Sequence, residues 1–507
     1  MKCDRPGRTR VARCDAMVSR QARLRSLGVC AGLFAASWAF SANAAVCYAN
    51  AAASGGNGSS WAAAYKDLQS ALNNAACNEV WVAQGVYKPV VPVNVGSPTN
   101  AERAITFNIK PGVAVYGGFA GGETSRAAAD PVAHATILSG DIDNNDDANN
   151  ADGNFVDETS ADIAGKNSIH VVIMDGTTGT PIASNTVLDG FTLTGGDNTV
   201  IDTNNGGGAL LCKGNGSGHQ CSPTLARLRI LGNKAVFGGG IALNGYSDGD
   251  SSPTLTQVYF SGNFATTLGG GLHNNGQLGG ASSPLLRSVT FSANSASSYG
   301  GAIENNGVSP TLINVTFSGN SASLGGAVHN NGNGSGNHAS PTLLNATFSG
   351  NSAAYGGAMY NAANSGGASN PVMYNVVLWG DSASQADPEI GGSGNSGLDY
   401  MTTIYYGIEQ GGCQGAQSCS NVLAGDPLLG TLDDHGGFVP TFMPGVGSSA
   451  INSVPCYLTP YTDARDAPRP DPASANLATA CDMGAVEVAS LAGDSIYVDG
   501  FGALQYR

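Results

Sequence analysis

Short apolar stretches alternate with small polar residues through most of the chain. The stretch TLINVTF at 311–317 is one example, and Gly, Asn, Ser or Pro interrupts such stretches every few residues. No stretch of the repeat region keeps the 3.6-residue spacing of a helix beyond one turn, so the pattern predicts short strands joined by tight turns. One segment differs: residues 61–76 (WAAAYKDLQSALNNAA) form an amphipathic helical pattern with Ser60 as N-cap, and we expect it to cover the open edge of the first strand.

The strand pattern repeats with a fixed period. A Gly-Gly-x-aliphatic element recurs with steps of 31, 31, 31, 25 and 31 residues, and its aliphatic residues are Leu210, Ile241, Leu272, Ile303, Val328 and Met359. A period of this size indicates stacked units, each buried by its neighbours. We therefore predict an all-β solenoid, a parallel β-helix whose successive turns are spaced by about 4.8 Å.

A second element, aromatic-x-x-Asn, accompanies the first. Stacking of successive turns predicts an interior column of Phe260, Phe291, Phe317 and Phe348. It also predicts a column of amide-to-amide hydrogen bonds at a bend, made by Asn233, Asn263, Asn294, Asn320 and Asn351. The paired glycines suit a turn that requires positive φ.

The single 25-residue step identifies a row of insertions. Between Asn306 and Ser309 the chain takes a short path, whereas the other repeats carry about six extra residues at the matching place. These insertions occupy 245–252, 276–283, 332–340 and 363–370. We expect them to form loops on one side of the solenoid. Such a row often makes a binding face, and slack surface loops are the alternative.

The N-terminus predicts export. Eight basic residues precede the apolar run Leu27–Phe40, which is followed by Ala42-Asn43-Ala44. This order is typical of a secretory signal peptide over 1–44, and the basic region is long enough that translation could start at Met17. The apolar run is too short to span a bilayer, and no later segment is apolar enough to do so.

Charge limits the class of partner. Only 12% of the 507 residues are charged. Removing 1–44, with eight basic and two acidic residues, leaves 14 basic and 35 acidic residues and a net charge of −21. Such a chain repels nucleic acid and anionic lipid, so neutral glycans, cations and other proteins are the expected partners.

Eight cysteines remain after the signal region, and an even number in an exported chain indicates disulfides. Spacing of the C-x-x-C kind, which zinc sites use, is absent. Connectivity cannot be deduced from sequence, but the sequence-local pairing is Cys47–Cys77, Cys212–Cys221, Cys413–Cys419 and Cys456–Cys481.

The GGA[IVLM] and FxxN elements resemble the polymorphic outer membrane protein repeats, which implies a right-handed parallel β-helix of a surface protein. Other segments resemble the N-terminal half of exported β-helix repeat proteins. They are GGNGSSWAAAYKDLQSALNNA with EVWVAQGVYKP (55–89), VYGGFAGGET (115–124), LSGDIDNND (138–146) and LDGFTLTGG (188–196).

The C-terminal part is similar to the choice-of-anchor Q domain. The resemblance rests on Asp426-Pro427-Leu428-Leu429, Gly436-Gly437, Pro440-Thr441, Ala450-Ile451, Arg469-Pro470 and Cys481-Asp482-Met483-Gly484-Ala485-Val486-Glu487. We therefore divide the chain into a signal peptide (1–44), an N-terminal cap with the first turns (45–130), the β-helix (131–400, repeats 206–381), a Q-like region (401–488) and a tail (489–507). The tail's DSIYVDGF is either a last strand or a sorting element.

Candidate catalytic residues are few. Some β-helices are polysaccharide lyases or hydrolases, which need a base near acidic groups or two carboxyls across the scissile bond. From Gly206 to Gly380 the only acidic residues are Asp248, Asp250 and Glu304, and basic residues are almost as scarce. We predict no catalytic residue here.

Two sets of residues could hold a metal. His273, Glu304 and His329 share one repeat position, where a metal is conceivable, but a solvent-facing column with variable occupants is the simpler interpretation. The acidic run 141–158 offers alternating oxygen ligands of the kind that Ca²⁺ prefers. The candidate calcium ligands are Asp141, Asp143, Asn145, Asp147 and Asp152.

The calcium loop departs from an EF-hand, because its sixth residue is Asp146 rather than Gly and its twelfth is Asp152 rather than Glu. A hydrated acidic loop is the alternative. Taken together, the sequence favours a secreted or cell-surface, adhesin-like scaffold that binds glycan or protein without catalysis. The alternatives are a pectate-lyase-like enzyme that acts on polysaccharide and a structural spacer.

Overall fold

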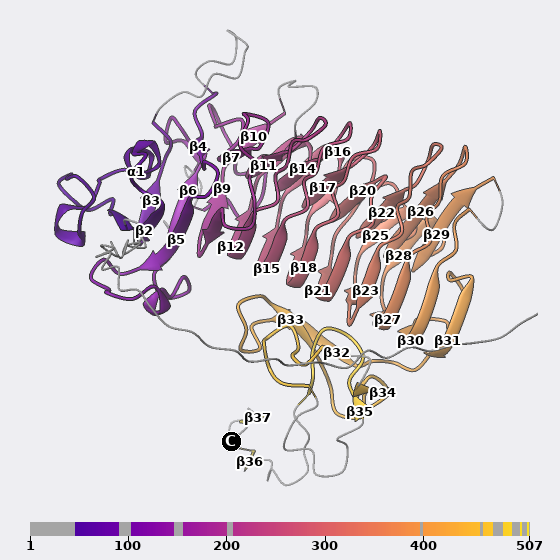
Figure 1. Ribbon diagram of the computed structural model, residues 1–507. Helices are drawn as coiled ribbons and strands as arrows, with labels where there is room; N and C mark the ends of the chain where they lie inside the picture. The colour runs from indigo at the N-terminus through magenta and orange to yellow at the C-terminus, as the bar shows by residue number, and fades with distance from the viewer. Residues whose placement is uncertain are drawn as a thin grey trace, which may run out of the picture. The chain divides into compact units, whose positions relative to one another are not determined.

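The computed structural model describes residues 46–90, 103–146, 156–199, 206–395, 399–456, 460–469 and 480–488, with two short strands beyond them. All of these residues belong to one unit, Ala44–Arg507. The predicted signal peptide therefore lies outside the described residues. Figure 1 shows the main feature of the unit, a row of β-strands stacked turn upon turn.

The largest face of the solenoid is a parallel sheet of 16 strands, called sheet 1 here. Its main path follows chain order, as expected when each turn pairs with the next. The path is β1 (Val46–Ala49), β2 (Glu79–Ala83), β5 (Ala114–Phe119), β8 (Val187–Asp189), β12 (Thr224–Leu231), β15 (Thr254–Ser261), β18 (Leu285–Ser292), β21 (Thr311–Ser318), β23 (Thr342–Leu344), β27 (Val372–Leu378), β30 (Thr403–Glu409) and β31 (Ser418–Leu423). Beside it lie β3 (Gly85–Tyr87), β6 (Thr136–Ser139), β9 (Thr192–Thr194) and β24 (Thr347–Ser349).

A second parallel sheet of nine strands, sheet 2, forms another face. Its strands contain the aliphatic residues of the Gly-Gly-x-aliphatic elements. They are β4 (Phe107–Asn108), β7 (Val172–Asp175), β11 (Leu210–Lys213), β14 (Ile241–Asn244), β17 (Leu272–Asn275), β20 (Ile303–Asn306), β22 (Val328–Asn331), β26 (Met359–Ala363) and β29 (Ile390–Gly394).

Shorter strands complete each turn as a third face. They are β10 (Asp197–Asn198), β13 (Lys234–Phe237), β16 (Phe264–Leu268) and β19 (Ser295–Ala296), followed by the pair β25 (Ser352–Tyr355) and β28 (Ser382–Ala386). The repeat period, the parallel pairing and the register together confirm the predicted all-β solenoid.

The interior phenylalanine column is confirmed. Phe260, Phe291, Phe317 and Phe348 are fully buried. Their rings stack with centroids 4.5, 5.3 and 4.5 Å apart along the column. Parallel strands in register place equivalent residues on the same face of each turn, so the rings meet.

The asparagine column is also confirmed, and it stands at the bend after sheet 1. Each side-chain amide donates to the next side-chain carbonyl, at 3.0, 2.9, 3.0 and 2.8 Å from Asn233 to Asn351. The same carbonyl accepts the backbone N–H of the preceding column residue, as Asn263 does for Asn233. The ladder thereby satisfies polar groups that burial would otherwise leave costly.

The paired glycines have the predicted backbone role. Gly325 has φ +66°, which favours glycine. A Cβ on its neighbour Gly326 would lie 2.3 Å from the carbonyl oxygen of Gly357 in the next turn. The first glycine therefore makes the turn, and the second permits close approach between turns.

The predicted helix at 61–76 is wrong in its extent. Trp61–Ala63 is a 3-10 turn (η1), which Ser60 caps as predicted, and α1 is only Leu68–Asn73, capped by Asp67. Between them Tyr65 is extended, and its backbone hydrogen-bonds to Tyr48 and Asn50 of the first-strand region. Pairing with the edge of β1 outweighs local helical preference, and this extended segment covers the edge. A further 3-10 turn among the described residues, η3, is Arg126–Ala128.

All four sequence-local disulfides are present: Cys47–Cys77, Cys212–Cys221, Cys413–Cys419 and Cys456–Cys481. The first two join residues of the buried core.

The C-terminal region folds back on the outer face of sheet 1. Its antiparallel pairs are β32 (Leu429–Asp433) with β33 (Thr441–Pro444) and β34 (Val454–Pro455) with β35 (Ala480–Cys481). Thr290 of β18 donates to the carbonyl of Pro440 at 2.7 Å. Thr347 of β24 accepts from the backbone of Ala485 at 3.0 Å.

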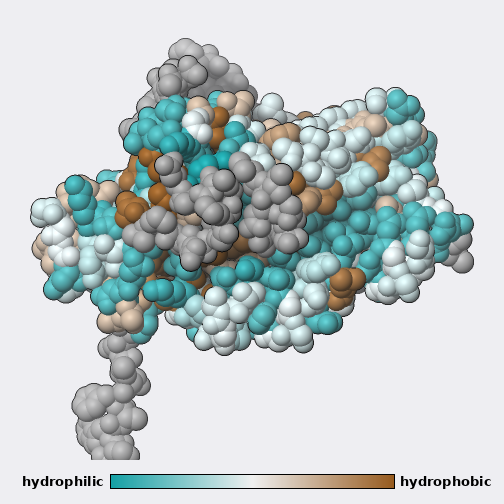
Figure 2. Space-filling view, turned by 90° about the horizontal axis from the view of Figure 1, so that it is seen from above, coloured by the Kyte–Doolittle hydropathy of each residue, from teal (hydrophilic) through white to brown (hydrophobic). Residues whose placement is uncertain are grey.

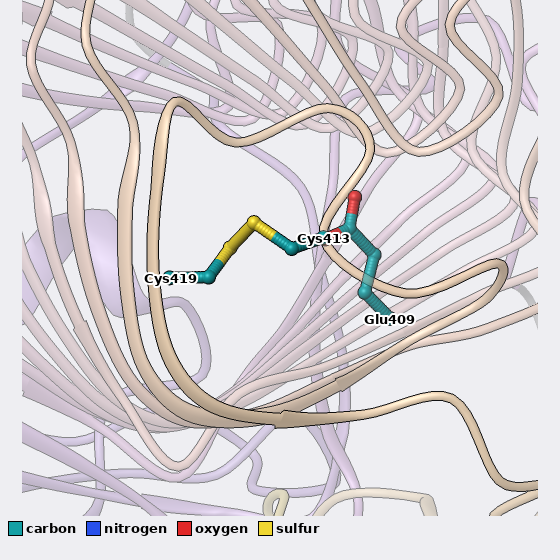
Figure 3. A group of neighbouring side chains, drawn as sticks. All are labelled: Glu409, Cys413 and Cys419. Atoms are coloured by element: carbon teal, nitrogen blue, oxygen red, sulfur yellow. A yellow bond between two sulfur atoms is a disulfide. The ribbon is translucent and has the colours of Figure 1, made fainter.

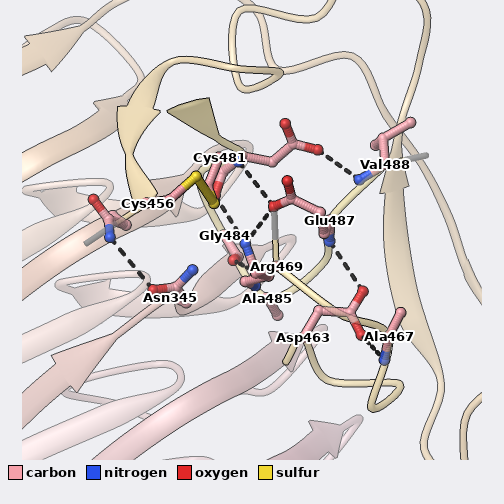
Figure 4. A network of polar contacts seen from close by, with 12 residues as sticks. Asn345, Cys456, Asp463, Ala467, Arg469, Cys481, Gly484, Ala485, Glu487 and Val488 are labelled. Carbon is pink, nitrogen blue, oxygen red and sulfur yellow. Dashed lines mark hydrogen bonds and ion pairs between the residues drawn. A yellow bond between two sulfur atoms is a disulfide. The ribbon is translucent and has the colours of Figure 1, made fainter. Parts of the chain in front are cut away.

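A buried ion network holds this region together (Figure 4). The Arg469 guanidinium donates to the Glu487 carboxylate at 3.0 Å and to the carbonyls of Asp482 and Gly484. Asp463 accepts from the backbone of Glu487. The motif residues at Arg469 and 481–487 thus lie together. In the tail, β36 (Tyr497–Val498) pairs with β37 (Leu504–Gln505) as a hairpin, so part of DSIYVDGF is a strand.

We predict that Phe317→Ala lowers the free energy of unfolding by about 3–5 kcal/mol, because it leaves a cavity between two stacked rings. Stacked turns depend on their neighbours, so hydrogen exchange should accelerate in the turns of Phe291 and Phe348 as well. Ser318→Ala, at the partly exposed next position, is the control and should change stability little. Chemical denaturation with equal midpoints for Phe317→Ala and wild type would contradict this.

Candidate functional site

A cavity of about 420 Å³ lies on the outer face of sheet 2. Residues alternate between the two faces of a strand, so His273 points outward while Leu272 and Asn274 point into the core. The floor comes from β14, β17 and β20, the insertion loops supply one set of lining residues, and the third face supplies another. The lining residues are Gly206, Asn215, Phe237, Ala242, Leu243, Asn244, Tyr246, Leu268, His273, Asn275, Gln277 and Asn306.

The insertion loops are ordered against one another. Gly216, in the loop that the Cys212–Cys221 disulfide closes, donates its N–H to the carbonyl of Tyr246 at 2.9 Å. Ser247 donates its N–H to the carbonyl of Gln277 at 3.0 Å. Gly334 donates to Asn364 at 2.9 Å in the later loops. The predicted row therefore exists on one side, and backbone hydrogen bonds join neighbouring loops within it.

The 25-residue repeat has no insertion, so the row of loops is interrupted at Gly307. A Cβ on Gly307 would lie 3.5 Å from the Gln277 side chain and 3.3 Å from the Asn337 side chain. The flanking loops 276–283 and 332–340 thus approach each other above Gly307. The cavity extends to this place, since Asn306 is part of its lining.

The lining chemistry is aromatic and amide. Tyr246 is 37% exposed, so its ring is accessible at the rim. Phe237 packs against the His273 ring with centroids 5.5 Å apart. No Asp, Glu, Lys or Arg is among the lining residues of this cavity. Such a surface offers flat apolar rings and neutral hydrogen-bonding groups, and a cavity of this size suits a small ligand.

The His-Glu-His column is buried, so its interpretation as a solvent-facing position is wrong. His273 is 6%, Glu304 0% and His329 3% exposed. The rings of Phe237 and Tyr299 cover the outer face here, and Tyr299 stacks on His329 with centroids 4.7 Å apart.

Within this column one polar contact is strong. His329 Nδ1 lies 2.6 Å from Glu304 Oε2. Burial lowers the pKa of His273 to about 4 and raises the pKa of Glu304, an effect that His329 opposes. The register places Glu304 between the two histidines on adjacent strands. Their ligand atoms do not all lie within 4.8 Å of one another, so the column is not arranged as a metal site.

Within the described residues, one set of three metal-ligating side chains meets that distance: Glu409, Cys413 and Cys419. Figure 3 shows the Glu409 carboxyl beside the Cys413–Cys419 disulfide. Thiolate is the form of cysteine that binds metal, and a disulfide supplies none. This set is therefore not a thiolate metal site.

Part of the predicted calcium loop is described. Asp141 is buried and forms an ion pair with Lys88 at 2.8 Å. Asp143 is exposed and accepts from the backbone of Lys166, and Asn145 donates its backbone N–H to Asp141. The other two predicted ligands, Asp147 and Asp152, lie outside the described residues. Lys88 already supplies one positive charge at the Asp141 carboxylate, so calcium would compete with an ammonium group.

Two further carboxyls of the run 141–158, Asp146 and Asp157, were not chosen as calcium ligands from the sequence. Asp146 accepts from the backbone of Ala164 and from Asn167. Burial raises the pKa of Asp146 to about 6, and burial together with Asp146 raises the pKa of Asp157 to about 8. The proximity of Asp157 to Asp146 arises from the tertiary fold. No pattern in the residues between them predicts it.

The three acidic residues of the repeat region are separate from the cavity lining. Asp248 is exposed, and Asp250 accepts from Ser252 at 2.6 Å. Glu304 is bonded to His329 in the buried column. The sequence also missed a second amide ladder, in which Asn274, Asn305, Asn330 and Asn361 are joined inside sheet 2 at 2.7–2.8 Å. The recurring HNN, ENN and HNN triplets carried that signal.

The face seen in Figure 2 is mainly hydrophilic or intermediate in hydropathy, with hydrophobic residues in separate patches. Among the described residues, no helix has the length and apolar character needed to cross a membrane.

Comparison with known families returns one match. The model of the Chlamydia polymorphic membrane protein repeat matches residues 288–306 and 314–331, which span β18 to β20 and β21 to β22. The repeat resemblance is therefore supported over this part of the solenoid. No curated protein and no solved structure matches the chain.

We predict that calcium binding at 141–158 raises the melting temperature of the native chain, because a ligand of the folded state stabilises it by mass action. Asp143→Ala combined with Asp147→Ala should remove that gain. Calorimetry with millimolar calcium and then with chelator measures it. Identical melting curves in both conditions would mean that the loop is only hydrated.

The raised pKa of Asp157 predicts a pH dependence of stability. Its folded value of about 8 exceeds the ordinary 3.8, so between these values the folded chain holds a proton that the unfolded chain lacks. This contribution is complete at acid pH and is lost as pH rises through about 8, at no more than about 1.4 kcal/mol per pH unit. Asp157→Asn stays neutral, so its melting temperature relative to wild type should increase from about pH 5 to about pH 8.5. A constant difference would contradict the shift.

Proposed function

We propose that this chain is an exported surface scaffold that binds neutral glycan in the sheet 2 cavity and breaks no bond. The observation that carries the proposal is the cavity lining itself. Aromatic rings (Phe237, Tyr246) stand beside side-chain amides (Asn275, Gln277), and no charged side chain lines the space. Sugar rings present apolar faces and hydroxyl groups, which match rings and amides respectively.

Repetition of the loops supports multivalent binding. Neighbouring insertions project from successive turns and are joined by backbone hydrogen bonds. Each turn contributes a few neutral contacts, and several weak contacts along one ligand add through effective concentration. A surface protein with exposed neutral loops is an alternative partner of the same face.

Surface location is supported by three features. The matched repeat belongs to a family described as membrane proteins. The sequence at 1–44 has the order of a secretory signal peptide. Four disulfides suit an oxidising compartment outside the cytosol.

The domain division and the Q-like assignment remain part of this proposal. The buried Arg469–Glu487 pair supports the assignment, because motif residues that are distant in sequence are in contact. In this proposal the described part of the Q-like region after β31, from residue 426 onward, braces the outer face of sheet 1 and leaves the sheet 2 face to the ligand. The mode of attachment to a surface lies with this region or with the tail.

We predict that Tyr246→Ala with Gln277→Ala weakens binding to neutral glycans by at least tenfold, because both side chains belong to the cavity lining. Binding is measured on a glycan array and then by titration with the glycan that binds. Tyr461→Ala is the matched control, since Tyr461 is 91% exposed in the C-terminal region. It should bind as wild type does.

Shortening 245–252, 276–283, 332–340 and 363–370 to the 25-residue pattern should preserve the fold and sharply reduce binding. One natural turn already lacks the insertion. Depolymerisation of a polysaccharide by the intact chain, lost on replacing Asp248, Asp250 or Glu304, would instead establish the enzyme alternative.

A further inference from the structure

A column of bulky side chains follows the corner between the third face and sheet 2, and we call it the corner column. Each of five successive turns contributes one member, and the members pair in parallel from turn to turn. They are Phe237, Leu268, Tyr299, Leu324 and Tyr355. An aromatic ring stands at every second turn, with leucine between, so the column has a period of two turns.

The corner column packs on the outward residues of sheet 2 with the same two-turn period. The Phe237 ring contacts the His273 ring of the following turn, with centroids 5.5 Å apart. Two turns later, the Tyr299 ring stacks on the His329 ring of its own following turn at 4.7 Å. The His329 ring also stacks on Tyr360, at 5.8 Å. The outer surface here therefore repeats as a unit of two turns.

The column extends the sheet 2 cavity along the solenoid. Phe237 and Leu268 belong to the cavity lining. Beyond the cavity, Tyr299 is 38% and Tyr355 39% exposed, so both rings are accessible. The cavity is therefore the first part of a longer surface that continues to Tyr355.

The cavity also contains polar groups that no described residue satisfies. His273 Nε2 and Asn215 Oδ1 are buried without a hydrogen-bond partner, and both residues line the cavity. Burial lowers the pKa of His273 to about 4, so its ring is uncharged at neutral pH. Unpaired buried groups are costly, and a ligand that carries hydroxyl groups can pair with both.

Charge favours a neutral ligand on this surface. Within 235–380 the charged residues are Asp248, Asp250, Arg287 and Glu304. None of them belongs to the corner column or to the cavity lining. Glu304 is buried and bonded to His329. A ligand with a charge on every unit would therefore meet no opposite charge along the column.

We propose that the cavity and the corner column together bind one extended chain of neutral, equatorially linked sugars, which lies along the solenoid axis. This inference rests on the proposed glycan binding and names its ligand class. Such a chain is flat, and each ring is turned over relative to the one before, so the same ring face recurs at every second sugar. A sugar ring with its linking oxygen is close in length to the spacing of about 4.8 Å between turns.

The two periods therefore match. The same ring face meets an aromatic side chain at Phe237, Tyr299 and Tyr355, where apolar surfaces pack against each other. Leucine contacts the alternate sugars. The hydroxyl groups at the edge of the chain reach the unpaired atoms of His273 and Asn215 in the cavity.

The test measures affinity against the number of sugars in the probe. Cello-oligosaccharides of two to six sugars are neutral and equatorially linked. Malto-oligosaccharides of the same lengths are the control series, because their axial linkage makes the chain helical. We expect affinity for the cello series to rise with length up to about five sugars, one for each turn of the column. The malto series should show no such rise.

A matched variant removes the rings beyond the cavity. Leucine already occupies the column at two turns, so Tyr299→Leu combined with Tyr355→Leu should fold, which circular dichroism and melting temperature check. Its affinity for cellohexaose should fall about tenfold, while its affinity for cellobiose, which occupies the cavity alone, should equal that of wild type. Tyr405→Leu is the control, since Tyr405 is 40% exposed on β30 of sheet 1.

Three results would overturn the inference and leave the proposed function standing, provided that Tyr246→Ala with Gln277→Ala still weakens glycan binding. They are equal affinity for every length of the cello series, cellohexaose affinity unchanged by Tyr299→Leu with Tyr355→Leu, and binding of a different neutral glycan but not of the cello series. A chain that binds no neutral glycan loses both proposals. A protein ligand whose binding the Tyr299→Leu, Tyr355→Leu variant abolishes would then assign the column to a protein partner.

Discussion

In-register pairing between successive turns is the constraint on which the rest of the structure depends. Each turn hydrogen-bonds to the next through parallel strands, so equivalent residues form columns about one strand spacing apart. Every interior position must then tolerate contact with its own copy. Phenylalanine does so by stacking, asparagine by passing a hydrogen bond along, and glycine by allowing backbones to approach. Charged side chains cannot repeat in such columns without repulsion, and this accounts for the low charge of the repeats.

A turn at either end of the solenoid has a neighbouring turn on one side only, so other segments must cover its open side. At the N-terminal end, the extended segment at Tyr65 pairs with the edge of β1, and α1 packs beside it. At the C-terminal end, the columns change chemistry at Asp381, Glu389 and Glu409, and a disulfide-closed loop follows. The described residues between 426 and 488 then return along sheet 1 and cover its outer face, where the Arg469 network fixes them.

The proposed binding face follows from the same repetition. Because insertions recur at one point of the turn, they stack as a row, and their backbones pair as the strands do. The cavity beneath them combines outward residues of sheet 2 with Phe237 and Leu268 of the third face. Its neutrality distinguishes it from the charged grooves that acid–base chemistry on polysaccharides requires. Glu304, which lies in β20 of this floor, is buried and bonded to His329.

The amino-acid sequence by itself determined the solenoid, its period, the phenylalanine and asparagine columns and the row of insertions. These are properties of repetition, because a residue that recurs at a fixed interval must meet its copy in any stacked arrangement. Tertiary structure alone decided the break of the predicted helix at Tyr65, the burial of the His-Glu-His column and the meeting of Asp146 with Asp157. Each of these features depends on contacts that the repeat spacing does not specify. The spacing of residues along the chain therefore could not predict them. The cavity is of the same kind, since it exists only where loops, sheet 2 and the third face come together.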